Sequence, residues 1–146
     1  MNAIHLVKRA VSSLSQNPPT PQDIAIVAQV LNIAEFAVWS DMQFRDQRHS
    51  IIVLRRFDVI ALTAVTSERA AALLHDVGKN ISNLGFFSRV IATVVGPRGQ
   101  RFIAYHDHER LGAELLDSIS DPRTVALVGG LVDDEISLLL KEADDI

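Results

Sequence analysis

Apolar side chains recur at steps of three and four residues along most of this chain, and that spacing restricts its fold more than any other feature. Residues at such steps lie on one face of an α-helix, so each run predicts an amphipathic helix. Alternation of period two and hairpin turns, which would indicate β-strands, are both missing from the sequence. The sequence therefore predicts an all-α fold, a compact bundle of about six to eight helices.

Proline, glycine and capping residues separate the predicted helices. Thr20 followed by Pro21 is a typical helix start, and so is Asp121 followed by Pro122. Further boundaries are expected at a cap on Thr66 or Ser67, a helix end at Gly78, a loop over 79–83, a turn over 96–99 and a cap on Asp133. The predicted helical spans are 4–14, 21–40, 46–62, 68–77, 87–94, 105–118, a helix from 122 and a last one to 144.

Length and composition exclude several classes of protein. A chain of 146 residues fits one domain with one core. Without cysteine there is no disulfide, thiolate metal site or cysteine nucleophile, and we expect a cytoplasmic protein. The net charge of -4 provides no strong field for nucleic acid or an anionic membrane surface. The longest apolar run covers only residues 125–132, far short of the roughly 20 residues that span a bilayer.

Histidines continue the apolar stripes of two predicted helices. His49 precedes Val53 and Phe57 at steps of four, which places its ring on the buried side of the helix. His108 precedes Leu111 by three residues and is expected to face the core in the same way. These two rings should therefore point inward.

Like the two histidines, carboxylates also lie at the ends of apolar helix faces. Asp144 follows Leu140 by four residues on the last helix, and the doublet of His75 and Asp76 follows Leu74 at the end of the fourth. An inward-facing carboxylate needs a cation or hydrogen-bond donors, because an unpaired buried charge costs roughly several kcal/mol.

Two imidazoles and two carboxylates from three helices form a donor set that suits Mn, Fe, Co, Ni or Zn. The residues predicted to meet around such an ion are His49, His75, Asp76 and Asp144.

Each of these residues also has a simpler interpretation. A single histidine on a helix face can be a core residue bonded to a carbonyl, and Asp144 can be a solvated residue on a fraying last turn. Lys79 can interact with the carbonyls at a helix C-terminus. Four further residues are expected to be exposed to solvent: His5, Arg55, Arg56 and His106.

Four sequence blocks, taken in order, resemble the HD-domain superfamily of metal-dependent phosphohydrolases. They are RHSIIVLRRF with His49, AAALLHDVGK with His75 and Asp76, HERLGAELL beginning at His108, and LLLKEADDI with Asp144. The set is also similar to small stand-alone bacterial HD-domain proteins. The resemblance implies one HD-like domain over 1–146, with a motif-bearing core over 46–146 and covering helices in the first 45 residues.

The resemblance implies one divalent metal ion, Mn, Fe, Co, Ni, Zn or Mg, held by His49, His75, Asp76 and Asp144. It further implies hydrolysis of a nucleotide or another small phosphoester by a metal-activated water. Asp76 would orient that water, His108 would bond the phosphate or the leaving oxygen, and Lys79, with Arg48 as second choice, would balance the phosphate charge.

Two other functions remain open at this stage. The chain can be a catalytically degenerate HD module that binds metal or nucleotide and serves as a signalling or scaffold domain. It can also be a helical bundle in which ion pairs, such as Asp76 with Lys79, take the place of metal. The expected partner is a small phosphorylated molecule rather than nucleic acid or a membrane, with a homodimer left open.

Overall fold

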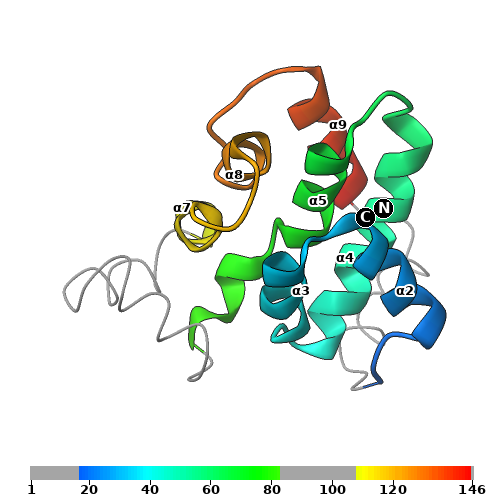
Figure 1. The fold of residues 1–146 in the computed structure, drawn as a ribbon. Coiled ribbons are helices and arrows are strands. Elements are labelled where there is room, and N and C mark those ends of the chain that lie inside the picture. The colour runs from blue at the N-terminus through cyan, green and yellow to red at the C-terminus, as the bar shows by residue number, and fades with distance from the viewer. Residues whose placement is uncertain (1–16, 83–107, 146) are drawn as a thin grey trace.

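Residues 17–82 and 108–145 are described by a computed structural model of the chain. All regular structure in these two ranges is helical (Figure 1), which confirms the predicted all-α fold. The helices are α2 (Pro21–Val30), α3 (Ile33–Ser40), α4 (Phe44–Ile60), α5 (Thr66–Leu74), the 3-10 helix η1 (Val77–Ser82), α7 (His108–Leu116), α8 (Pro122–Val128) and α9 (Glu135–Asp144). The helices predicted over 4–14 and 87–94, and residues 105–107 of another, lie outside the described residues.

Helix α5 forms the centre of the described bundle. It contacts α2, α3, α4 and α8 (Figure 1). Its residues from Ala70 to Leu74 are all buried, so the helix is covered on every side. The three consecutive alanines carry short side chains, which lets the neighbouring helices approach closely. The end of α5 therefore lies deep in the molecule.

Helix α4 lies between α5 and α9, and it contacts both. Val53 and Phe57 are fully buried, as their spacing predicts, and they pack in one core cluster with Leu140 and Ala143 of α9. Ile60, which continues the same spacing, is exposed where α4 ends. The packing of α4 against α9 joins two segments that are far apart in sequence.

The helix predicted over 21–40 is in fact two helices. Leu31 has an extended backbone, with ψ at 145°, and Asn32 begins α3. The Asn32 side chain accepts a hydrogen bond from the Glu35 amide at 2.7 Å, and the Glu35 carboxylate accepts one from the Asn32 amide at 2.9 Å. This capping box satisfies two amides that a helix start leaves without partners, which stabilises the break.

Other helix ends agree with the sequence or differ from it by one to three residues: α4 covers 44–60 rather than 46–62, α5 ends at Leu74 rather than at Gly78, which lies within η1, and α7 ends at Leu116 rather than at residue 118. Thr20 caps α2 and Asp121 caps α8, each followed by proline as predicted. The cap of α9 is Asp134 rather than Asp133, and α5 begins after Val65, whose amide donates to the Glu68 carboxylate at 3.0 Å. Residues 79–82, predicted as part of a loop, belong to η1, where the Lys79 amide donates to the Asp76 carbonyl at 3.0 Å.

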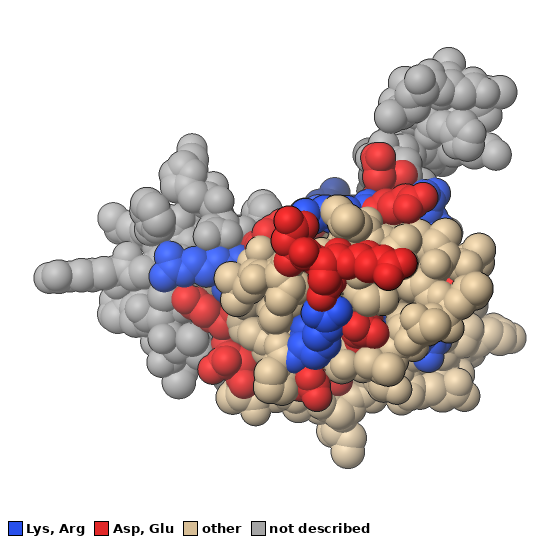
Figure 2. All heavy atoms as spheres, turned by 90° about the horizontal axis from the view of Figure 1, so that it is seen from above, with Lys and Arg blue, Asp and Glu red and all other residues tan. Residues whose placement is uncertain are grey.

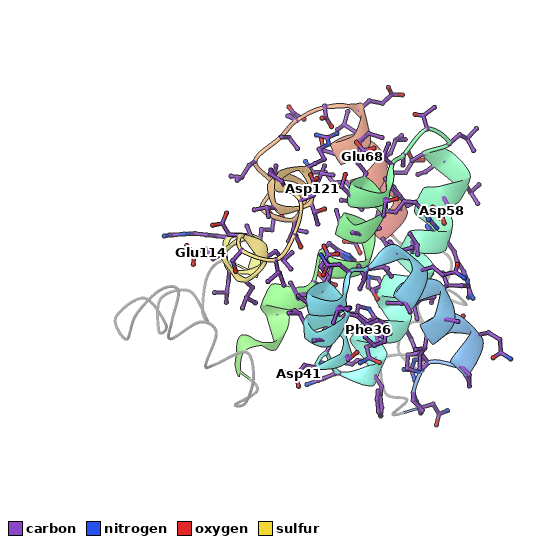
Figure 3. The ribbon with its side chains drawn as sticks, in the orientation of Figure 1. Phe36, Asp41, Asp58, Glu68, Glu114 and Asp121 are labelled. Carbon is purple, nitrogen blue, oxygen red and sulfur yellow. The ribbon has the colours of Figure 1, made fainter. Side chains whose placement is uncertain are left out.

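A partly buried ion-pair cluster links α5, α8 and the start of α9. Arg123 donates to the Glu68 carboxylate through two nitrogens, at 2.9 and 3.0 Å, and to the Asp134 carboxylate at 2.7 Å. Arg123 follows Asp121 by two residues, and Figure 3 labels Asp121 and Glu68 on facing elements. These contacts hold the N-terminal end of α9 in place.

None of the described helices combines the length and the apolar character needed to cross a membrane.

Candidate metal centre

Side chains from three separate segments converge at one place in the bundle. His49 comes from α4, Asp144 is the last residue of α9, and His75 with Asp76 form the turn between α5 and η1. One possible ligand atom from each of the four residues lies within 4.8 Å of all the others. The four side chains could together hold a metal ion, as the sequence predicts.

The ring of His75 is fixed by its own helix. Its Nδ1 lies 2.7 Å from the Ala72 carbonyl oxygen, which can only accept, so Nδ1 carries a proton. This bond leaves Nε2 facing the carboxylates, 3.1 Å from Asp144 Oδ1 and 3.3 Å from Asp76 Oδ2. A histidine that donates through one nitrogen to a carbonyl and presents the other to a ligand is the usual arrangement around protein metals.

Asp144 is the point where the histidines meet. Its Oδ1 lies 2.8 Å from His49 Nε2 and 3.1 Å from His75 Nε2. The two imidazole rings lie close together, with centroids 5.8 Å apart. Although 43% of the Asp144 side chain is exposed, it is bound by both rings rather than solvated on a fraying turn.

Asp76 is the most buried member of the cluster, with 10% of its side chain exposed. Its second oxygen, Oδ1, lies 3.1 Å from Lys79 Nζ, while half of the Lys79 side chain remains exposed. Lys79 therefore contacts a carboxylate instead of the helix carbonyls that its position also allowed. It stands beside the cluster, at the edge where solvent enters.

In the metal-free protein the cluster shares protons instead of a metal. Burial alone would lower the pKa of His75, but hydrogen bonds with Asp144 and Asp76 outweigh it and raise that pKa to about 10. Burial would raise the pKa of Asp76, whereas its contacts with His75 and Lys79 lower it to about 2. Hydrogen bonds from His49 and His75 hold the pKa of Asp144 well below its usual range. The two carboxylates thus favour a cation between them, either a proton on His75 or a divalent metal.

A cavity of about 280 Å³ adjoins the cluster. Asp76, His75 and Asp144 line it, together with the apolar side chains of Leu127, Val128, Val132 and Leu140. Two lysines, Lys79 and Lys141, also line it and bring positive charge. Such a cavity combines a ligand-holding cluster, an apolar wall and cations, which is the usual composition of a small-molecule site.

Three cavity residues with polar side chains were not predicted from the sequence. Lys141 and Ser137 precede Asp144 by three and seven residues, so helical spacing alone would have placed them beside it. Glu109 also lines the cavity, and its carboxylate lies so close to Gly130 that a Cβ at position 130 would clash with it. Gly130 has a φ of 64°, which also favours glycine.

Other predicted site residues lie elsewhere or are not described. Arg48 donates to the carbonyl of Asn17 at 2.6 Å and does not line the cavity. His108 begins α7, but its side chain falls outside the described residues, as do His5 and His106.

Comparison of the chain with protein-family models, with curated proteins and with solved structures finds no match. The geometry of the cluster and its cavity is therefore the basis for the function proposed below.

Proposed function

We propose that this protein is a divalent-metal-dependent phosphohydrolase of the HD-domain superfamily, acting on a nucleotide or another small phosphoester. One observation carries the proposal: His49, His75, Asp76 and Asp144 present their ligand atoms within 4.8 Å of one another beside an accessible cavity. The order of these residues in the sequence, a histidine, a His-Asp doublet and a later aspartate, is the order that characterises the superfamily.

The donor set fits a divalent metal of the first transition row, or Mg²⁺ with more reliance on the carboxylates. His49 and His75 would bind it through Nε2, Asp76 and Asp144 through one oxygen each. When bound, such a cation lowers the pKa of water and polarises a phosphoryl group. Hydrolysis then forms one P–O bond from water and breaks the P–O bond to the leaving group.

The chain's own residues would orient and bind the substrate. Asp76, with one oxygen toward His75 and the other toward Lys79, is placed to orient water. Lys79 and Lys141 line the cavity and would bind the phosphoryl oxygens. By the resemblance, His108 would bond the phosphate or the leaving oxygen; it directly precedes Glu109, whose side chain lines the cavity.

The size of the cavity favours a small substrate. A volume of about 280 Å³ accommodates a small phosphoester rather than a polymer. On the face drawn in Figure 2, acidic and basic side chains lie side by side among uncharged residues, rather than in one broad basic surface of the kind that binds nucleic acid.

A second candidate function rests on exposed apolar side chains. Val59, Leu62 and Val65, at the connection from α4 to α5, are 73%, 84% and 56% exposed. Exposed apolar residues of this kind are typical of surfaces that bind another protein. They favour a degenerate HD module that acts as a scaffold.

An activity screen separates the two functions. The purified protein would be tested with Mn²⁺, Fe²⁺, Co²⁺, Ni²⁺, Zn²⁺ or Mg²⁺ against phosphomonoesters, cyclic nucleotides and nucleoside triphosphates. We expect metal-dependent phosphate release that Asp76→Asn abolishes and Arg55→Met leaves unchanged, because Arg55 pairs with Asp23 away from the cavity. Metal binding without turnover on any substrate would favour the scaffold function.

A further inference from the structure

Arg56 lies on the same face of α4 as His49, two helical turns further along, because the two residues are seven positions apart. Its Nη2 donates to the backbone carbonyl of Glu142 at 3.2 Å and reaches that of Asp145 at 3.4 Å. These two carbonyls flank Asp144, the last residue of α9. Arg56 is exposed, as the sequence predicts, and its guanidinium in addition binds the end of α9.

The neighbouring Arg55 behaves differently. Its side chain pairs with Asp23 in the first turn of α2 rather than with the carbonyls at the end of α9. The two adjacent arginines thus carry the same charge on the same helix but serve different partners. Arg55 is a matched control for Arg56.

The position of Asp144 makes this contact important for the cluster. The last carbonyls of an α-helix have no partners within the helix, and such ends fray. A cation at a helix C-terminus satisfies these carbonyls and interacts favourably with the helix dipole. Helix α4 consequently contacts the region of Asp144 in two ways. His49 binds the Asp144 carboxylate, and Arg56 binds backbone carbonyls before and after Asp144.

We infer that Arg56 is a positioning residue: it fixes the backbone around Asp144 so that the carboxylate is already in place when a divalent cation binds. This inference rests on the proposed metal site. Fixing a ligand during folding removes the entropy that binding would otherwise cost, and residues that support metal ligands raise affinity for this reason. Arg56 contributes without touching the metal.

The test is a titration with Co²⁺ alone, followed by visible absorption, of wild type, Arg56→Met and Arg55→Met. We expect Arg56→Met to weaken Co²⁺ affinity by roughly three- to tenfold, and Arg55→Met to change it by less than about twofold. Melting temperatures in chelator should be similar for the two variants, because each loses only solvent-exposed contacts. Equal affinity of Arg56→Met and wild type, or an equal loss in both variants, overturns the inference.

Amide hydrogen exchange provides a second measurement, in chelator. Arg56→Met should speed exchange at the amide of Asp145, which donates to the Lys141 carbonyl at 3.0 Å, and Arg55→Met should not. Unchanged exchange overturns the inference. Should Arg56→Met not fold, Arg56→Lys replaces it. Both contacts come from Nη2, and a lysine side chain is shorter than that of arginine, so the affinity of Arg56→Lys should still lie below wild type, and wild-type affinity overturns the inference. Absence of Co²⁺ binding by wild type overturns the metal site itself, so the two failures are distinguishable.

Discussion

The two ends of α9 are held by side-chain clusters of opposite kinds. At the start of the helix, the Arg123 guanidinium contacts Asp134 at 2.7 Å and Glu68 at 2.9 Å. At its end, the Asp144 carboxylate contacts His49 at 2.8 Å and His75 at 3.1 Å. Both clusters place two carboxylates around nitrogen donors. In the first cluster one guanidinium, which stays charged, contacts both carboxylates. In the second, Lys79 contacts Asp76, whereas the nitrogens at Asp144 belong to imidazoles, which must be protonated to carry charge.

The first cluster therefore needs no added cation at its carboxylates, whereas the second needs a proton or a metal ion. The single Arg123 guanidinium contacts both carboxylates of its cluster, so these contacts need neither a proton nor a metal. The histidine cluster holds two carboxylates whose pKa values are lowered; Lys79 contacts Asp76, but a proton or a metal must be added to place a cation beside Asp144. It also borders a cavity, which gives that cation a route of entry. We therefore expect binding chemistry at the end of α9 and only structural stabilisation at its start.

The largest expected effect concerns metal affinity. His75→Ala or Asp76→Ala should weaken divalent-metal binding by at least about 100-fold, since each removes a ligand that its neighbours hold in place. Arg123→Met should stay within about threefold of wild type, because Arg123 lies in the other cluster. Elemental analysis after reconstitution with Mn²⁺, Fe²⁺, Co²⁺, Ni²⁺ and Zn²⁺, together with Co²⁺ titration, measures this. If the wild-type protein binds no metal under these conditions, the cluster at the end of α9 is not a metal site and does not differ from the Arg123 cluster in this respect.

A stability effect should follow at the other end of α9. Arg123→Met should lower the free energy of unfolding by about 2 kcal/mol, because Glu68, with 11% of its side chain exposed, would keep a buried charge without its cation. Urea denaturation in chelator measures the loss, and Arg123→Met combined with Glu68→Gln should recover part of it. A loss no greater than that of an ordinary surface substitution would show that the Arg123 cluster is not structural.

The smallest effect is a dependence of stability on pH. The pKa of His75 is about 10 in the folded metal-free protein, above the ordinary value of about 6.5 that applies when the chain is unfolded. The stabilisation by its charge is therefore complete below about pH 6.5 and is lost as pH rises through about 10. We expect a decline on the order of 1 kcal/mol in chelator, since solvent at the half-exposed Asp144 weakens the pair.

Metal should remove this decline, because a metal-bound imidazole is already deprotonated. Urea denaturation at several pH values, with and without Co²⁺, distinguishes the two states, and His75→Asn in chelator is the control that should lack the slope. An identical slope with and without Co²⁺ would mean that ion pairs, rather than metal, complete the cluster.

Local signals in the sequence were sufficient to predict the start of a helix where a capping residue followed by proline determines it. Thr20 with Pro21 and Asp121 with Pro122 each mark a helix start that the structure confirms. The break at Asn32 was missed, although Asn32 and Glu35 have the spacing of a capping box, because the apolar stripe continues across it. At Asp133 and Asp134 two neighbouring residues can both cap, and local sequence does not choose between them.

Periodicity by itself determined that this chain is helical and which faces of its helices are apolar, since a helix places residues three and four apart on one side. It also determined that His49 and Asp144 stand on apolar faces, and the order of the motifs associated them with His75 and Asp76. Only the tertiary structure decided that these four side chains meet, that Lys141 and Glu109 border the same cavity, and that Arg56 holds the end of α9. Such contacts depend on how α4, α5 and α9 pack, and packing is set by the whole core rather than by the spacing within one helix.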